Sequence, residues 1–214
     1  MRIPETFRGL VDDLPLEIYL RNLPHWRQDG ATYFVTFRLH DSVPESVLRN
    51  QRVEVRKLYR ELGVGVDTKL SASNPHSEKL RALQQRHTRA IADILDEGRG
   101  SSILRNSDAR APVNEALRYH AENTCEVYAY VIMPNHVHAL VRPLLKKKLE
   151  KIFQSVKAFS SRRIGDGGQL WQKESYDTII RDEEHFWRAV DYIQRNPTKA
   201  KLLRSEYELA IYVD

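Results

Sequence analysis

The feature that most constrains the fold is a pair of apolar segments, 125–133 and 136–142, joined by a Pro-Asn turn at 134–135. Both segments are rich in β-branched and aromatic residues, which favours strands, and the short link favours a tight hairpin. His136 and His138 stand two residues apart in the second segment. Side chains at i and i+2 of a strand point to the same face, so both imidazoles can bind one divalent metal ion.

The rest of the pattern predicts an α+β chain with an antiparallel sheet. Besides the hairpin, the expected strands are 32–39 and 176–181, and the expected helices are 45–62, 78–96, 111–122 (opened by Pro112), 146–163 and 183–196. Reduced to its core, the order is βαββαβ, a ferredoxin-like arrangement. Such a sheet has two helices on one face, so the added C-terminal helix can pack against the other face. Pro197 is expected to end that helix.

Residues 45–110 are predicted to form a helical insertion between the first strand and the rest of the core. Two charged helical stretches there flank a polar loop rich in Gly and Ser. The chain has 214 residues, of which 41% are hydrophobic, enough for one elaborated core. We therefore expect a single domain over 1–214 with the insertion inside it.

Charge and cysteine content narrow the class of protein. The net charge of +5, with seven basic side chains crowded between 146 and 163, favours a polyanionic partner. Beside a metal site, a track for phosphates is a better interpretation of this stretch than a merely solvated helix face. A lone Cys125 excludes an intrachain disulfide and suits a reducing cytosol. No apolar run approaches the ~20 residues of a membrane span.

The last predicted helix carries the other half of a possible reaction site. Tyr192 and Asn196 are four residues apart and so share one helix face. A phenolate can attack phosphorus and hold a covalent ester, while a metal ion polarises the phosphate. Two imidazoles and an amide oxygen leave coordination positions open, which suits Mg²⁺ or Mn²⁺, and imidazole also accepts Zn²⁺ or Ni²⁺ in vitro. Each of these residues has an ordinary structural explanation alone, so only the combination indicates catalysis.

At these residues the chain resembles a known family. Residues 131–138 resemble the HUH motif (His, hydrophobic residue, His) of single-tyrosine transposases, and 189–197 resemble their catalytic helix. Residues 23–26, 30–39 and 170–177 resemble segments of the REP-associated tyrosine transposases, an IS200-like group.

This resemblance implies a metal-dependent single-stranded DNA endonuclease and strand transferase that acts on short hairpins, the repetitive extragenic palindromes (REP). Tyr192 would be the nucleophile and would leave a 5′-phosphotyrosine link and a free 3′-OH. His136, His138 and Asn196 would bind the metal, with Asn196 standing where related transposases have Gln. The implied setting is the bacterial cytoplasm, at the nucleoid. No membrane or nucleotide cofactor is expected, and the choice between monomer and homodimer stays open.

Further residues are candidates for DNA binding. The set comprises Arg188, Lys151, Lys157, Arg162, Arg163, Trp171 and Tyr176. Arg188, one turn before Tyr192, could stabilise the phenolate. Trp171 and Trp26 could stack on bases or pack in the core, and both readings stay open. Tyr176 is a weaker second candidate for the nucleophile, because no ligand residue follows it by four positions.

Two other functions compete with strand transfer. One is a hairpin DNA- or RNA-binding protein that uses the basic helix 146–163 and does not cleave. The other is a replication or conjugation initiator on the same two-histidine scaffold. The second is disfavoured, because such enzymes have larger chains, helicase domains or paired tyrosines, and this sequence has no nucleotide-binding glycine loop.

Overall fold

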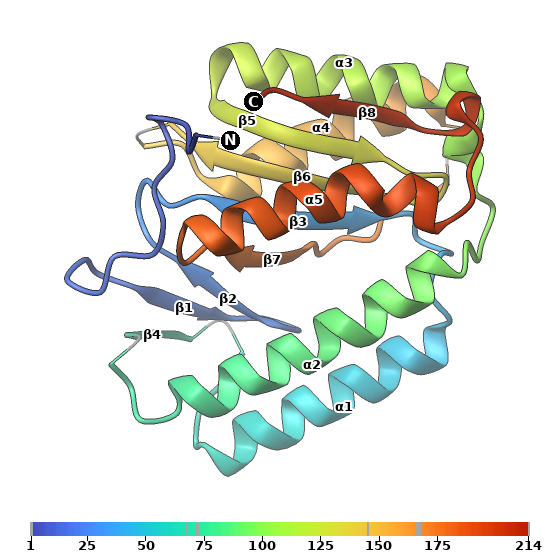
Figure 1. Cartoon of the computed structure of the whole chain (residues 1–214). Coiled ribbons are helices and arrows are strands. Elements are labelled where there is room, and N and C mark those ends of the chain that lie inside the picture. Colours follow the sequence, from blue (N-terminus) through green and yellow to red (C-terminus); the bar gives the residue numbers. More distant parts are fainter. Residues whose placement is uncertain (1, 67, 72, 145, 166–167, 214) are drawn as a thin grey trace.

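The computed structural model describes residues 2–66, 68–71, 73–144, 146–165 and 168–213. Its elements follow in the order β1 (Glu17–Leu20), β2 (Pro24–Arg27), β3 (Tyr33–Arg38), α1 (Glu45–Glu61), β4 (Lys69–Ser71), α2 (Ser77–Asp96), η1 (Ile103–Arg105), α3 (Ser107–Asn123), β5 (Cys125–Ile132), β6 (His136–Pro143), α4 (Leu149–Ile164), β7 (Tyr176–Ile179), α5 (Glu183–Lys199), η2 (Arg204–Glu206) and β8 (Glu208–Ile211) (Figure 1).

A five-stranded sheet in the order β7-β3-β6-β5-β8 forms the centre, and all its neighbours are antiparallel. The strands of the unit β3-α3-β5 are separated by β6, and those of β6-α4-β7 are separated by β3. This interleaving of two βαβ units is the ferredoxin-like core that the sequence predicts. The chain adds β8 beyond β5, a strand that the sequence pattern did not indicate.

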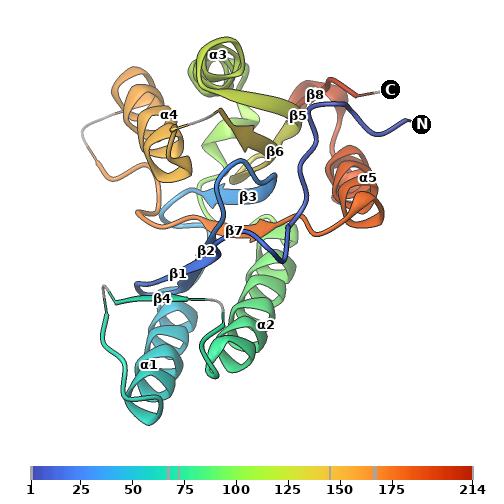
Figure 2. The same ribbon diagram turned by 90° about the vertical axis from the view of Figure 1, so that its left-hand side faces the viewer.

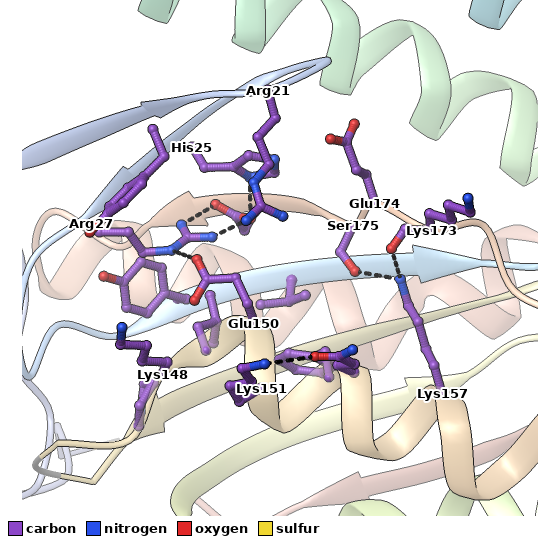
Figure 3. A pocket seen from close by; sticks show the side chains of 18 of the residues that line it. Arg21, His25, Arg27, Lys148, Glu150, Lys151, Lys157, Lys173, Glu174 and Ser175 are labelled. Carbon is purple, nitrogen blue, oxygen red and sulfur yellow. Dashed lines mark hydrogen bonds and ion pairs between the residues drawn. The ribbon is translucent and has the colours of Figure 1, made fainter. Parts of the chain in front are cut away.

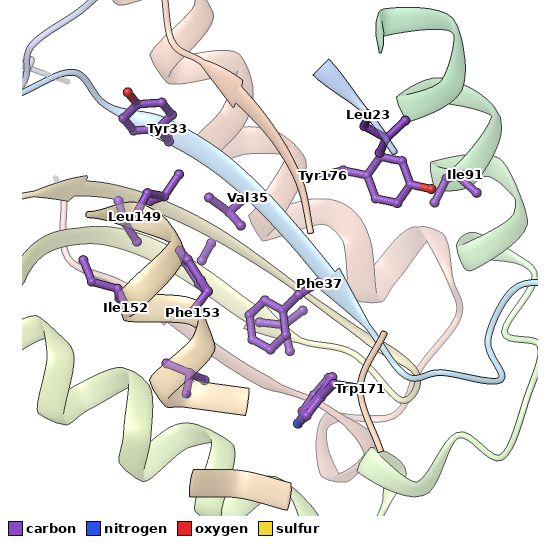
Figure 4. Packing of buried hydrophobic residues seen from close by; sticks show 14 of the residues in the cluster. Leu23, Tyr33, Val35, Phe37, Ile91, Leu149, Ile152, Phe153, Trp171 and Tyr176 are labelled. Carbon is purple, nitrogen blue, oxygen red and sulfur yellow. The ribbon is translucent and has the colours of Figure 1, made fainter. Parts of the chain in front are cut away.

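Helices cover both faces of this sheet. Helices α3 and α4 lie on one side and α5 lies on the other (Figure 2). On the first face, Val35 and Phe37 of β3 pack with Ile152 and Phe153 of α4 and with Trp171 (Figure 4). The rings of Phe37 and Trp171 are 4.9 Å apart between centroids. This apolar layer anchors β3.

The second face receives α5 through the apolar stripe that the sequence predicts. Phe186, Val190 and Ile193 are buried against β5 and β6, together with Tyr128, Ala129, Val131, Met133 and Leu140. Phe186 is fully buried, with its ring centroid 5.0 Å from that of Phe7 and 5.1 Å from that of Tyr128. The N-cap Asp182 accepts a hydrogen bond from the His185 amide, which fixes where the helix begins.

Two helix ends differ from the sequence prediction. Helix α3 begins at Ser107, because the Asn106 side chain caps it, and Pro112 lies inside it instead of opening it. Helix α5 continues through Pro197 to Lys199. Proline costs one internal hydrogen bond, but its fixed φ suits a helical turn, and here Pro197 is buried. Asn196 consequently lies within a helix and is held as rigidly as Tyr192.

The insertion is helical, as expected, but it also contributes a strand. Strand β4 pairs with β1, which pairs with β2, giving a second sheet in the order β2-β1-β4. Four-residue strands are too short to show a clear alternation, so the sequence pattern missed them. Helix α2 reaches the edge strand β7, where Gln84 Nε2 donates to the Asp177 carbonyl at 2.9 Å.

Two expectations from composition can be compared with the structure. Cys125 is buried, and burial raises the pKa of its thiol to about 12, so it behaves as a small apolar residue. Within the part of the chain that the structure describes, no helix is long and apolar enough to cross a bilayer.

Replacing Phe186 by Ala should destabilise the protein strongly, because α5 is held mainly by this face. Removing a fully buried Phe costs about 3–5 kcal/mol. Urea unfolding measures the change in the free energy of unfolding. Arg188→Ala on the same helix is the control; it removes an exposed pair with Glu184 and should cost less than about 0.5 kcal/mol. Equal losses in both variants would contradict this account of α5.

Candidate active site

The two histidines of β6 face each other in the interior. His136 and His138 are each 1% exposed, and their Nε2 atoms are 2.9 Å apart. The outer nitrogens are also engaged: His136 Nδ1 lies 2.7 Å from Asn135 Oδ1, and His138 Nδ1 lies 2.8 Å from Thr36 Oγ1. Two imidazoles held from behind, with their other nitrogens converging, are the arrangement that metal-binding histidines adopt.

Both histidines are held in the neutral form that a metal ligand requires. Burial lowers the pKa of His136 to about 3. Burial lowers the pKa of His138 as well, and the neighbouring His136 lowers it further. Near neutral pH both rings therefore have a lone pair available on one nitrogen.

Tyr192 lies directly against this pair. Its ring centroid is 5.1 Å from that of His138 and 5.8 Å from that of Phe34, in edge-on contacts. Burial raises the pKa of the Tyr192 phenol, and the carboxylates of Asp96 and Asp93 on α2 raise it further. The phenol is consequently protonated at neutral pH in the metal-free protein and needs help to lose its proton.

Asn196 follows Tyr192 by one helical turn and is 2% exposed. Neither its amide oxygen nor its amide nitrogen has a hydrogen-bond partner among the residues that the structure describes. A buried amide normally finds partners, so an orphaned one suggests a missing ligand. Asn196 also lies near enough to the Tyr192 hydroxyl to lower its pKa in part.

These residues fit a divalent metal ion. Two converging imidazoles and one orphaned amide oxygen make a mixed set of nitrogen and oxygen ligands with positions left open. Within the described ranges no group of three or more His, Cys, Asp or Glu side chains could hold a metal. A metal site here therefore depends on the amide of Asn196 as the third protein ligand.

The aromatic residues proposed for DNA stacking are in the core. Trp171 is 4% exposed, packs on Phe37, and donates its indole hydrogen to Ser160 Oγ at 2.9 Å. Trp26 is 5% exposed. Tyr176 is 7% exposed and donates its hydroxyl to Gln51 at 3.1 Å. All three rings are buried, so the core interpretation holds for Trp171 and Trp26.

The basic candidates are scattered over several surfaces. Lys151 is exposed, whereas Lys157 is partly buried and donates to the Gln172 and Lys173 carbonyls and to Ser175 Oγ. Burial lowers the pKa of Lys157 to about 7. The three hydrogen bonds of this side chain hold the loop before β7. Arg162 and Arg163 are exposed at the C-terminal end of α4, and Arg188 is exposed on α5.

A groove of about 1060 Å³ lies between the small sheet, the start of α4 and the loop before β7 (Figure 3). Part of its lining is an ion network: Asp177 accepts from Arg27 and from His25 Nδ1, and Arg27 also contacts Glu150. Burial alone would raise the pKa of Asp177, but Arg27 and His25 outweigh it and hold the pKa well below its usual range.

The groove is lined by exposed basic side chains and also by the carboxylates of Glu17, Asp29 and Glu174. Arg21, Lys147, Lys148, Lys151 and Lys173 line it. Val35 and Asp177 on its floor are cross-strand partners, while Thr36, the next residue of β3, points to the histidines. Successive strand residues face opposite ways, so the groove and the histidine pair lie on opposite faces of the sheet.

Sequence reasoning missed the residues that support the histidines. The sequence pattern indicates only a turn at Asn135 and a strand at Thr36. The strand register that brings Thr36 opposite His138 depends on three-dimensional pairing. Asp93 and Asp96 lie in the insertion, about 100 residues before Tyr192, and no spacing rule joins them to it.

Comparison with known proteins shows that part of the chain is similar to a described family. Residues 101–196 match the family model described as "Transposase IS200 like". The matched segment contains both histidines, Tyr192 and Asn196. The resemblance to IS200-like transposases seen in the sequence is thus confirmed over this segment, which ends at Asn196 and excludes β3, α1 and α2.

None of the curated proteins matches this chain. A solved structure, described as a REP-associated tyrosine transposase bound to a REP hairpin, is similar with a TM-score of 0.44 and 17% sequence identity. That similarity covers 82% of this chain and 72% of the other chain.

His136→Gln should flatten the dependence of stability on pH in the metal-free protein. The folded pKa of about 3 lies below the ordinary histidine pKa of 6.5, so between these pH values the unfolded chain binds more protons. Stability therefore rises with pH in this window, by up to about 1.4 kcal/mol per pH unit, and is lost as pH falls below 6.5. Urea unfolding in EDTA between about pH 4 and pH 7 measures this slope.

The exposed His40, replaced by Gln, serves as the control and should leave the slope unchanged. A His136→Gln protein with the full slope of the wild type would show that this histidine is not the buried neutral group described above.

Proposed function

We propose that this protein is a metal-dependent single-stranded DNA endonuclease and strand transferase that acts on hairpin-forming, REP-like DNA. The observation that carries the proposal is the contact of the Tyr192 ring with His138, beside two converging Nε2 atoms. The match of a segment containing these residues to the IS200-like transposase family model supports it. We name hairpin DNA because one similar solved structure is described as bound to a REP hairpin, and we take nothing else from that structure.

The reaction proceeds by covalent catalysis at Tyr192. Its Oη attacks the scissile phosphorus, a bond from tyrosine oxygen to phosphorus forms, and the bond from phosphorus to the 3′ oxygen breaks. The phenol loses its proton and the leaving 3′ oxygen gains one. A later attack by another 3′-OH on the phosphotyrosine reverses these steps and joins a new strand, with no nucleotide cofactor consumed.

His136 Nε2, His138 Nε2 and Asn196 Oδ1 would hold Mg²⁺ or Mn²⁺. When bound, the ion supplies Lewis-acid polarisation of the scissile phosphate and favours ionisation of groups near it. The protein contributes the fixed geometry: the packing of α5 sets the position of Tyr192, and burial of both imidazoles excludes bulk water. Arg188, one turn earlier on α5, is proposed to steady the phenolate.

The DNA partner is proposed to bind the basic side chains of the groove through its phosphates. Lys148, just before α4, and Lys151 in its first turn lie opposite Arg21 and Lys173 across this hollow. Because the groove and Tyr192 lie on opposite faces of the sheet, the hairpin would bind at one face and its flanking strand would reach the other. Mutations in the groove should then change the affinity for the hairpin without changing the cleavage rate at Tyr192, and mutations at Tyr192 should do the reverse.

One observation favours the alternative, a non-cleaving binding protein. The phenol of Tyr192 has a raised pKa and two carboxylates close by, which oppose formation of the nucleophilic phenolate. A hairpin-binding protein on this scaffold would need only the groove. The two functions differ in whether a covalent adduct forms.

Wild-type protein should form a covalent adduct with a labelled single-stranded hairpin in Mg²⁺ or Mn²⁺, and Tyr192→Phe should form none. Denaturing gel electrophoresis separates the adduct from free DNA. Tyr176→Phe is the matched control, since that hydroxyl is buried against Gln51, and it should retain the adduct. Tight binding without any adduct from the wild type would favour the alternative function.

The double variant Lys148→Gln/Lys151→Gln should weaken hairpin binding about tenfold or more. Loss of two phosphate contacts should also reduce the slope of log affinity against log salt by about 1–2. The cleavage rate at saturating DNA should change little, since the groove is remote from Tyr192. Fluorescence anisotropy across salt concentrations measures the affinities.

Arg162→Gln/Arg163→Gln makes the same change of charge on the same helix but outside the described lining of the groove. It should change the affinity by less than about threefold. A larger effect from this pair than from the lysine pair would move the DNA to the other end of α4.

A further inference from the structure

The turn residue Asn135 joins the insertion to the candidate metal site. Its amide nitrogen donates to the Arg99 carbonyl at 2.9 Å and, more weakly, to the Leu95 carbonyl at 3.4 Å. Its amide oxygen lies 2.7 Å from His136 Nδ1. Carbonyl oxygens only accept hydrogen bonds, so the amide nitrogen must face α2 and the amide oxygen must face His136. Asn135 is 1% exposed, so water does not compete for these contacts.

This orientation fixes where His136 carries its proton. An amide oxygen is only an acceptor, so the hydrogen of neutral His136 must be on Nδ1. The lone pair of His136 Nε2 then points toward His138, whose Nε2 is 2.9 Å away. His136 therefore presents a metal-binding nitrogen before any metal arrives.

His138 has a different kind of partner. Thr36 Oγ1, 2.8 Å from His138 Nδ1, can either donate or accept a hydrogen bond. In the metal-free protein, His138 Nε2–H donates to His136 Nε2, and the threonine hydroxyl donates to His138 Nδ1. With a metal at Nε2, the proton of His138 must be on Nδ1 instead, where Thr36 can accept it.

The same end of α2 also contacts the helix that carries Tyr192. Asp96, the residue after Leu95, pairs with Lys199 of α5 at 2.5 Å. The following backbone is fixed by Gly100, which has φ +90°, and a Cβ there would lie 2.9 Å from the Asp41 carbonyl oxygen. The Arg99 carbonyl that receives Asn135 thus belongs to a turn that a side chain at Gly100 would distort.

We propose that Asn135 is a positioning residue through which the C-terminal end of α2 presets His136 as a metal ligand. His136 offers Nε2 permanently, whereas His138 becomes a ligand when its proton shifts from Nε2 to Nδ1. The insertion is then part of the site and not a separate module. The part of the inference that concerns metal affinity rests on the metal-dependent function proposed above, while the part that concerns the tautomer does not.

Nitrogen NMR of the histidine rings in the metal-free protein tests the tautomers directly. The expected result is a proton on Nδ1 of His136 and on Nε2 of His138. Asn135→Ala should remove the preference at His136. Asn135→Asp keeps an acceptor for Nδ1 but cannot donate to the Arg99 and Leu95 carbonyls, so it should restore the preference only in part. A proton on Nε2 of His136 in the wild type would overturn the proposal.

Calorimetric titration with Mn²⁺ gives the second readout. Asn135→Ala should bind Mn²⁺ about 10–100-fold more weakly, as loss of a residue that orients a ligand usually does. Asn135→Asp should recover part of that loss, because it keeps the acceptor for His136 Nδ1 but loses the donor to the Arg99 carbonyl, and a partial recovery separates positioning from a general failure to fold. Gln84→Ala is the control: it deletes another buried amide bond of α2, to the Asp177 carbonyl, away from the histidines, and should leave the affinity unchanged.

Unchanged Mn²⁺ affinity in Asn135→Ala would overturn the positioning role. If the wild type binds no Mn²⁺, the proposed metal-dependent function fails, and the ring spectra still decide the tautomer of His136. The two failures are therefore distinguishable.

Discussion

The register between β3 and β6 is the constraint on which the rest of the site depends. It pairs Thr36 with His138 and Arg38 with His136, and it turns Val35 and Phe37 toward α4. A slip of one residue would move every side chain of β3 to the opposite face. The histidines would then lose Thr36, and the apolar layer under α4 would lose its aromatic residues. The burial of β3 on one face thus holds the polar partners in place on the other.

Helix α5 brings Tyr192, the nucleophile proposed above, beside the histidines. Its apolar stripe is buried against β5 and β6, and this packing leaves Tyr192 at the margin of the stripe, against His138. Asn196 follows because the helix continues past it, with Pro197 buried in the next position. Ordinary packing on the two faces of the sheet therefore positions the residues of the proposed reaction. The groove lies on the first face, so a partner bound there would be remote from Tyr192.

Much of this arrangement could be predicted from the sequence, because strong local patterns encode it. The paired histidines after a Pro-Asn turn, and the spacing of Tyr192 and Asn196, place each pair on one face without knowledge of the fold. The short strands β1, β2, β4 and β8 gave no such pattern, since three or four residues are too few to establish a period. Their existence follows from tertiary pairing.

The partners of the site could not be predicted for a related reason. Asn135 and Thr36 acquire their roles from groups far away in the sequence, such as the Arg99 carbonyl. The stacking roles considered for Trp171 and Tyr176 failed because exposure depends on what covers a strand, and α4 and α1 cover these rings. The lysines and arginines in and near α4 form one basic stretch in the sequence. Only the fold shows which of them line the groove and which lie at the far end of the helix.

The most direct test of the central claim is a crystal structure of the protein soaked in Mn²⁺, with anomalous scattering used to locate the ion. The account predicts one strong peak bonded by His136 Nε2, His138 Nε2 and Asn196 Oδ1, next to the Tyr192 hydroxyl. A peak at another place would contradict the account. So would the absence of any peak, with His136 Nε2 and His138 Nε2 still hydrogen-bonded to each other.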